Sequence, residues 1–235
     1  YRHPREVIDV NVLGTLNILQ AAKDLDTGRI LITSTSEVYG TAQFVPISET
    51  HPLHPQSPYA ASKVAADALA LSFHQAFRLP VVIVRPFNTF GPRQSTRAVI
   101  PTIITQAPAG DTIKVGSTSP RRDFTYVTDT ADAFYRAAVT PEAVGRIVNV
   151  GTGMDGSIAD IIELVSRKLG KPLSLSVISR SSAGKSWLLN RVADLMPPEE
   201  ILRYTRMSPR ALFYDEPGRY KNKILFIEEA IGARD

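Results

Sequence analysis

The 235-residue chain contains no cysteine, which excludes disulfide bonds and thiolate metal sites and fits a reducing compartment. It also has no apolar run of about 18 residues, the length that a membrane-spanning helix needs, and no signal-peptide pattern. We therefore expect no membrane partner and a cytoplasmic location. No metal site is expected either, because metal-ligand spacing is missing among the histidines, which are His3, His51, His54 and His74.

Runs of like charge are absent as well. The net charge of +4 is spread along the chain rather than gathered into a basic tail, so no nucleic-acid partner is expected. The proportions of hydrophobic residues (43%) and charged residues (21%) are those of an ordinary globular chain. The sequence starts at Tyr1 and enters a helical pattern within a few residues, which we interpret as the mark of a fragment or a trimmed product.

Helix and strand patterns alternate along the first three quarters of the chain. The expected helices span 4–25, 59 onward, 99–107, 129–138 and 158–169, and the expected strands span 29–33, 80–85, 113–115, 146–150 and 173–178. This order predicts an α/β fold with a doubly wound parallel sheet. The small polar residues from Thr33 to Glu37 follow the first strand, at the edge where such sheets bind ligands.

The stretch SPYAASK, residues 57–63, combines a helix start with a reactive pair. Pro58 is typical of a first helical position, and Tyr59 and Lys63 lie four residues apart, on one helical face. A lysine ammonium near a phenol favours the phenolate, which lets a tyrosine exchange protons near neutral pH. The pair alone is a weak signal, because such spacing also occurs by chance.

Six blocks follow one another in the order NVLGT (11–15), STSEVYG (34–40), SPYAASK (57–63), RPFNTFGPRQS (85–95), RRDFTYV (121–127) and NVGTG (149–153). Together they resemble the NAD-dependent epimerase/dehydratase branch of the extended short-chain dehydrogenase/reductase family, and most of all its nucleotide-sugar 4,6-dehydratases of the UDP-N-acetylglucosamine type. The resemblance covers residues 1–178 and implies a truncated Rossmann-like doubly wound sheet that lacks its N-terminal strands. It also implies NAD, a nucleotide-sugar substrate and a homodimer.

The resemblance implies catalytic roles for four residues. Tyr59 would take the proton of the sugar C4 hydroxyl, with Lys63 as its partner and ribose contact, and Thr35 would hydrogen-bond the C4 oxygen. Glu37 would remove the C5 proton as water leaves from C6. Ser36 stands where some dehydratases carry an aspartate that protonates the leaving hydroxyl, so that acid is unassigned. A 4-epimerase stays open as an alternative, as does a plain capping or surface role for Glu37.

Binding roles are implied for residues in the same blocks. The expected cofactor contacts are Ser34, Tyr59, Lys63 and Arg85, and the expected substrate contacts are Asn88, Arg93 and Arg122. A guanidinium suits a diphosphate because it offers a bidentate fork, although Arg122 is also compatible with a solvated surface pair. Asn11 is expected to tie its helix to the adjacent strand.

The dinucleotide loop of the family is missing from the sequence. No G-x-x-G-x-x-G turn precedes Tyr59. We therefore expect weak NAD binding and impaired dehydratase activity, and an inactive protein or a binding partner remains an alternative.

Residues 179–235 have a different character and resemble a P-loop ATPase fragment. Gly184, Lys185 and Ser186 lie in the stretch SSAGKS, and an apolar strand is expected at 224–227, before Glu228 and Glu229. Lys185 would contact the phosphates of ATP and Ser186 a magnesium ion. Ser179 stands where the P-loop motif needs glycine, so a helix start beside an unrelated strand is the alternative. We interpret residues 176–182 as a junction between two unrelated segments.

Overall fold

The computed structural model describes residues 3–177, 201–204 and 224–227. The chain forms two compact units, one made of Tyr1–Gln94 and Arg121–Gly156, the other of Ser95–Pro120 and Ser157–Asp235. Among the described residues, no helix has the length and apolar character needed to cross a membrane.

The first unit is built on a parallel sheet. Its strands are β1 (Ile30–Thr33), β2 (Val81–Pro86) and β7 (Ile147–Val150), in the order β1-β2-β7. Ile30 is paired with Val81 at the start of β1, and Ile83 is paired with Ile147 at the start of β7. The predicted α/β class with a parallel sheet is confirmed.

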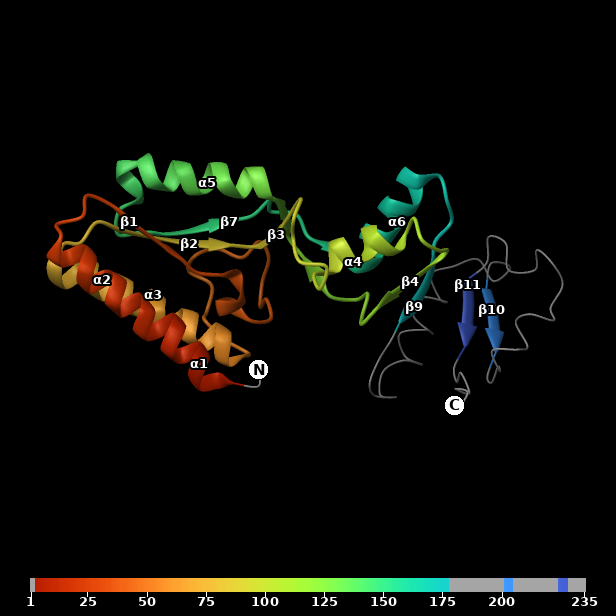
Figure 1. The fold of residues 1–235 in the computed structure, drawn as a ribbon, viewed down its shortest axis with the longest axis horizontal. Coiled ribbons are helices and arrows are strands. Elements are labelled where there is room, and N and C mark those ends of the chain that lie inside the picture. The colour runs from red at the N-terminus through yellow and green to blue at the C-terminus, as the bar shows by residue number, and fades with distance from the viewer. Residues whose placement is uncertain (1–2, 178–200, 205–223, 228–235) are drawn as a thin grey trace. The chain divides into compact units, whose positions relative to one another are not determined.

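Helices cover both faces of this sheet. Figure 1 shows α5 on one face and α2 and α3 on the other. The helical segments of the first unit are α1 (Pro4–Ile8), η1 (Asp9–Leu13), α2 (Gly14–Asp24), η2 (Ser36–Tyr39), α3 (Pro58–Phe77), α5 (Val127–Val139) and η3 (Pro141–Ala143).

Strand β2 supplies the centre of both cores. Val81 and Ile83 pack with Leu19 of α2 and Phe73 of α3, whereas Val82 and Val84 pack on the opposite face, with Ala137 of α5. This alternation follows from the two-residue period of a strand. A sheet covered on both faces needs a continuous apolar strand, and the run VVIV in β2 provides it.

The first predicted helix differs in its middle. The pattern over residues 4–25 predicts one regular helix, but a π-helical turn, η1, separates α1 from α2. Within this turn Asn11 donates a hydrogen bond from Nδ2 to Ser62 Oγ on α3, at 2.9 Å. Asn11 therefore ties its helix to another helix rather than to the expected strand. A π-helical turn adds a residue to the helix, which shifts the side chains that follow.

Short strands complete the first unit. β3 (Asn88–Phe90) pairs in parallel with β6 (Phe124–Tyr126), and β5 spans Arg121–Arg122. The sequence pattern did not predict β3, β5 or β6, because two or three residues are too few to display a strand period.

The second unit carries α4 (Val99–Gln106), β4 (Thr112–Val115), α6 (Ile158–Leu169) and β9 (Ser174–Val177), while β8 spans Gly156–Ser157 where the chain passes between units. β4 and β9 are parallel. Helix α6 has the predicted bounds because Ser157 and Asp160 form a capping box at its start and Gly170 ends it at φ +59°.

Two strands are described in the C-terminal part. β10 (Ile201–Tyr204) and β11 (Ile224–Ile227) pair in parallel, and β11 confirms the apolar strand predicted at 224–227. Gly184, Lys185, Ser186, Glu228 and Glu229 lie outside the described residues.

Candidate active site

The residues that follow β1 form the first part of the candidate site. The amide of Ser34 donates to Val84 O at 2.7 Å, which extends the pairing with β2 by one residue. Thr35 then caps η2, since its Oγ1 accepts a hydrogen bond from the amide of Glu37 at 3.2 Å. The Glu37 side chain is exposed and, within the described part of the chain, makes no ion pair or hydrogen bond. Thr35 and Glu37 are thus brought together in one turn at the carboxyl end of β1.

The start of α3 forms the second part. The Ser57 hydroxyl caps the helix by accepting from the amide of Ala60 at 3.0 Å, and Pro58 occupies the first turn, as the sequence predicts. Tyr59 is half-buried, and Lys63 follows one turn later. The Lys63 ammonium donates to the carbonyl oxygen of Thr33, so this helix is fastened to the end of β1.

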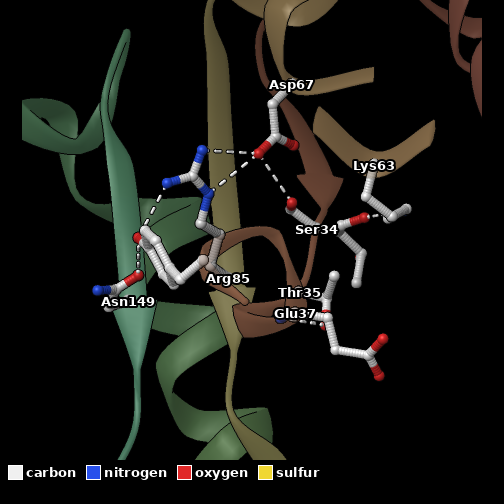
Figure 2. A network of polar contacts seen from close by, with 9 residues as sticks. Ser34, Thr35, Glu37, Lys63, Asp67, Arg85 and Asn149 are labelled. Atoms are coloured by element: carbon white, nitrogen blue, oxygen red, sulfur yellow. Dashed lines mark hydrogen bonds and ion pairs between the residues drawn. The ribbon is translucent and has the colours of Figure 1, made fainter. Parts of the chain in front are cut away.

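A buried ion pair lies beside Lys63. Asp67 of α3 and Arg85 of β2 are both about 2% exposed. Arg85 donates to Asp67 Oδ2 from Nε at 3.0 Å and from Nη2 at 2.9 Å, and the Ser34 hydroxyl donates to the same oxygen at 2.8 Å (Figure 2). Charged groups are rarely buried unless they are paired, so this cluster is a specific feature of the fold.

The network continues across the sheet to β7. Arg85 Nη1 donates to the Tyr39 hydroxyl at 2.9 Å, and this hydroxyl donates to Asn149 Oδ1 at 2.7 Å. Asn149 in turn donates from Nδ2 to Ile47 O at 3.1 Å, and its amide donates to Glu49 Oε1 at 2.9 Å. Polar side chains therefore link α3, all three strand ends and the loop after η2.

Burial shapes the electrostatics of this cluster. It lowers the pKa of Lys63, while the nearby Asp67 carboxylate acts in the opposite direction. Burial also raises the pKa of Asp67, opposed by the Ser34 hydrogen bond, by Arg85 and by Lys63. The two shifts have the same origin, because a less polar surrounding disfavours each charged form.

Sequence reasoning did not assign Asp67, Tyr39 or Asn149. An available signal was Asp67 itself, which stands in the apolar run AADALAL four residues after Lys63. Ser34 and Arg85 were expected to contact the cofactor, and that stays a prediction. In this structure their polar groups are engaged with Asp67 and Tyr39.

The expected substrate residues lie farther along the chain of the first unit. Asn88 and Arg122 are exposed, at the start of β3 and in β5. Arg93 is exposed and adopts a left-handed φ of +68° in the turn after β3, where residues 89–94 and Val127 line an open pocket. Their roles stay predictions.

Asp123, next to Arg122, organises the loop after β7. It accepts hydrogen bonds from the amide of Thr152 at 3.0 Å and from the amide of Gly153 at 2.8 Å. A side chain on Gly151 would approach the Asp123 carboxylate to 2.7 Å, which explains the need for glycine there. The blocks RRDFTYV and NVGTG therefore meet in space through Asp123.

Comparison with known proteins assigns the chain to a family. A family model described as GDP-mannose 4,6 dehydratase matches residues 1–193. The chain belongs to this family. The family resemblance inferred from the six sequence blocks is thereby confirmed. The family match extends past residue 178, through Gly184, Lys185 and Ser186, and nothing in it supports ATP or magnesium binding there.

The relatives of this GDP-mannose 4,6 dehydratase family member carry the names of several activities, among them a dehydratase, an epimerase and a GDP-6-deoxy-D-mannose reductase. A dTDP-glucose 4,6-dehydratase from an Actinoplanes species is 36% identical over 165 residues, which cover 70% of this chain and 51% of the relative. A UDP-glucose 4-epimerase from Mycolicibacterium smegmatis is 36% identical over 168 residues, covering 69% and 53%. The chain thus spans about half the length of the curated relatives it matches.

Solved structures agree with the family assignment. The dTDP-glucose 4,6-dehydratase of Bacillus anthracis, crystallised in complex with NAD, superposes with a TM-score of 0.69 at 30% identity. The match covers 74% of this chain and 57% of that one. The likeness confirms a Rossmann-like fold for the matched part of this family member.

Proposed function

We propose that this chain contains the proton-transfer residues of an NAD-dependent nucleotide-sugar 4,6-dehydratase. The observation that carries the proposal is the turn at the end of β1, where the exposed carboxylate of Glu37 follows the hydroxyl of Thr35. Lys63, from the helix that also carries Tyr59, is fastened to this same strand end. The Glu37 carboxylate, the Lys63 ammonium and the Thr35 hydroxyl therefore lie at one edge of the sheet, where parallel α/β folds bind ligands.

In this proposal Tyr59 accepts the proton of the sugar C4 hydroxyl. The charged Lys63, on the same helical face, favours the phenolate form of Tyr59. The Thr35 hydroxyl orients the C4 oxygen by a hydrogen bond. The proton leaves the substrate oxygen and enters the phenolate oxygen, so Tyr59 becomes neutral in this step.

Glu37 acts as the second base. A ketone at C4 acidifies the C5 hydrogen, and the Glu37 carboxylate takes that proton while the C6 hydroxyl leaves as water. Figure 2 shows the Glu37 carboxylate directed away from the Asp67 and Arg85 pair, so it is free to meet a substrate. The proton that completes the departing water has no assigned donor, since Ser36 stands beside Glu37.

The described residues fit the nicotinamide-ribose end of a dinucleotide. Lys63 has three N–H donors, of which one is given to Thr33 O, so donors remain for ribose hydroxyls. When bound, NAD would accept a hydride from C4 and return it to C6. We propose Tyr59 and Lys63 as the direct contacts and Ser34 and Arg85 as residues that shape this end of the site.

The substrate is proposed to be a nucleotide sugar of the UDP-N-acetylglucosamine type. Arg93 and Arg122 are exposed guanidinium groups suited to a diphosphate, and Asn88 can hydrogen-bond a sugar hydroxyl. A 4-epimerase is the second candidate, favoured by the similarity to the Mycolicibacterium smegmatis enzyme. The carboxylate of Glu37 favours dehydration, since epimerisation at C4 needs no base at C5.

We further propose a homodimer, formed by a second copy of this chain. Large apolar side chains are exposed along η1 and α2, with Val10 at 66%, Leu13 at 50% and Ile18 at 58%. An apolar helical face of this kind suits a self-complementary interface. Sedimentation equilibrium tests the dimer. We expect twice the chain mass, reduced to one chain mass by Ile18→Lys, and a monomeric wild type would contradict the proposal.

We also propose a cytoplasmic location, from the absence of cysteine.

Product analysis tests the proposed reaction. The chain is incubated with excess NAD and, in turn, a UDP-, dTDP- or GDP-linked sugar, and the products are analysed by mass spectrometry. Slow loss of one water from the sugar is the expected result, because we expect this chain to bind NAD weakly. An isomer of unchanged mass would support the epimerase, and no conversion of any sugar would overturn both proposals.

The variant Arg93→Ala tests the proposed diphosphate contact. We expect it to raise the KM for the nucleotide sugar, whereas the control variant Arg136→Ala on α5 should leave this KM unchanged.

A further inference from the structure

Asp67 is a buried charged residue that the proposed reaction does not use. It lies on α3 between buried alanines, Ala66 and Ala70, and is 2% exposed. Among the described residues, Asp67 accepts two hydrogen bonds from Arg85 and one from Ser34, all at Oδ2, while Oδ1 has no hydrogen-bond partner. Burying a carboxylate with one oxygen unsatisfied is costly, which calls for a role beyond packing.

Asp67 is connected to the N-terminal end of the turn that carries Thr35 and Glu37. It follows Lys63 by one helical turn, so the two side chains share a face of α3. Lys63 holds Thr33 through its carbonyl, and Asp67 holds the next residue, Ser34, through its hydroxyl. Two successive contacts from α3 therefore fix the backbone immediately before Thr35.

Arg85 connects Asp67 to the C-terminal end of the same turn. Its Nη1 donates to the hydroxyl of Tyr39, the last residue of η2. Thr35 and Glu37 lie between Ser34 and Tyr39 in the sequence. Ser34 bonds Asp67 directly, and Tyr39 is connected to Asp67 through Arg85. Figure 2 shows this arrangement, with Asp67 between Arg85 and Lys63 and above the turn that bears Thr35 and Glu37.

We propose that Asp67 is a positioning residue, which holds the Thr35–Glu37 turn at both ends through Ser34 and Arg85 and supplies the counter-charge of Lys63. The inference rests on the proposed function, because that function gives Lys63 and Glu37 their roles in proton transfer. Asp67 itself need not touch the substrate or the cofactor.

The charged groups around Asp67 support its role as the counter-charge of Lys63. The charged groups that face it are Lys63 from its own helix and Arg85 from β2, while Ser34 contributes a neutral hydroxyl. Burial lowers the pKa of Lys63, and the Asp67 carboxylate counteracts this. A neutral side chain at position 67 would let Lys63 lose its proton at a lower pH, and Tyr59 would then lose its cationic partner.

Nuclear magnetic resonance titration of Lys63 in the whole chain tests the charge relation. The ¹³Cε signal of Lys63 is assigned by its disappearance in Lys63→Met and is followed against pH in wild type, Asp67→Asn and Asp132→Asn. Asp132 is a matched control, because it pairs with Arg136 on α5 at 2.7 Å but is exposed. We expect the pKa of Lys63 to fall by about 0.5 to 1 unit in Asp67→Asn and to stay unchanged in Asp132→Asn.

Amide hydrogen exchange tests the positioning relation and remains usable if Asp67→Asn does not fold. Ser34→Ala removes only the hydroxyl tie to Asp67 and keeps the Asp67 charge. Exchange at Glu37 and Val38 should accelerate about tenfold in Ser34→Ala, while the pKa of Lys63 stays unchanged. Neither readout needs turnover, so a failed dehydratase assay would not affect them. An unchanged Lys63 pKa in folded Asp67→Asn, or unchanged exchange in Ser34→Ala, would overturn the proposal.

Discussion

The buried pair of Asp67 and Arg85 and the exposed pair of Asp132 and Arg136 use the same two residue types at similar distances, 2.9 Å and 2.7 Å. Their side chains are 2–3% exposed in the first pair and 55–76% exposed in the second. Distance alone therefore does not determine what a pair contributes. In the buried pair each charge depends on its partner, whereas water can solvate either member of the exposed pair.

The largest expected effect comes from breaking the buried pair. Arg85→Met leaves the Asp67 carboxylate without its cationic partner and two of its hydrogen bonds, and we expect the free energy of unfolding to fall by about 3–5 kcal/mol. Urea denaturation measures the change. The double variant Asp67→Leu/Arg85→Met removes both charges and should be more stable than the single variant. A double variant that is less stable than Arg85→Met would contradict the role assigned to burial.

A smaller loss is expected one link farther along the network. Tyr39→Phe removes the hydroxyl between Arg85 and Asn149 and leaves polar atoms of both without that partner. We expect a destabilisation of about 1–3 kcal/mol, again by urea denaturation. Tyr135→Phe, on an exposed tyrosine of α5, is the matched control and should be neutral. Equal stability of the two variants would show that the link at Tyr39 contributes nothing.

The burial of Lys63 should make the free energy of unfolding depend on pH. Burial lowers its pKa in the folded chain below the ordinary value of 10.5, which applies in the unfolded chain. Between these two pKa values the unfolded chain binds more protons, so the folded state gains stability as the pH rises. The unfolding free energy of wild type should therefore increase relative to Lys63→Met as the pH rises toward 10.5. A difference that falls over this range would contradict the sign.

The smallest effect is expected at the exposed pair. Arg136→Ala removes an i,i+4 contact on the surface of α5 and should cost about 0.3–0.5 kcal/mol. Added salt should reduce this cost, because surface charges are screened. Thermal unfolding at low and high salt measures both. A loss as large as that of Arg85→Met would abolish the contrast between the two pairs.

The same contrast explains what the sequence could reveal. Helix α6 was predictable because Ser157 and Gly170 mark its ends locally, and β2 because its run of valine and isoleucine needs two covered faces. Tyr59, Lys63, Thr35 and Glu37 stand out through block patterns.

Other features depend on partners that are distant in the sequence. Asp67 meets Ser34 and Arg85 from 33 and 18 residues away, and Tyr39 meets Asn149 from 110 residues away. A single sequence contains no local pattern that predicts such distant pairings. The π-helical turn at η1 and the three-residue strands β3 and β6 were missed for a local reason, since they are too short to show a period.

The most direct test of the central claim concerns Glu37 and needs no cofactor. A nucleotide-linked 4-keto-6-deoxy sugar already carries the ketone that acidifies C5, so exchange of its C5 hydrogen for deuterium in D₂O reports the Glu37 base alone. We predict that the wild-type chain accelerates this exchange over buffer and that Glu37→Gln lowers the rate by at least about 100-fold, while Glu142→Gln, an exposed residue of η3, does not. Equal exchange rates for wild type and Glu37→Gln would contradict the assignment of Glu37 as the base.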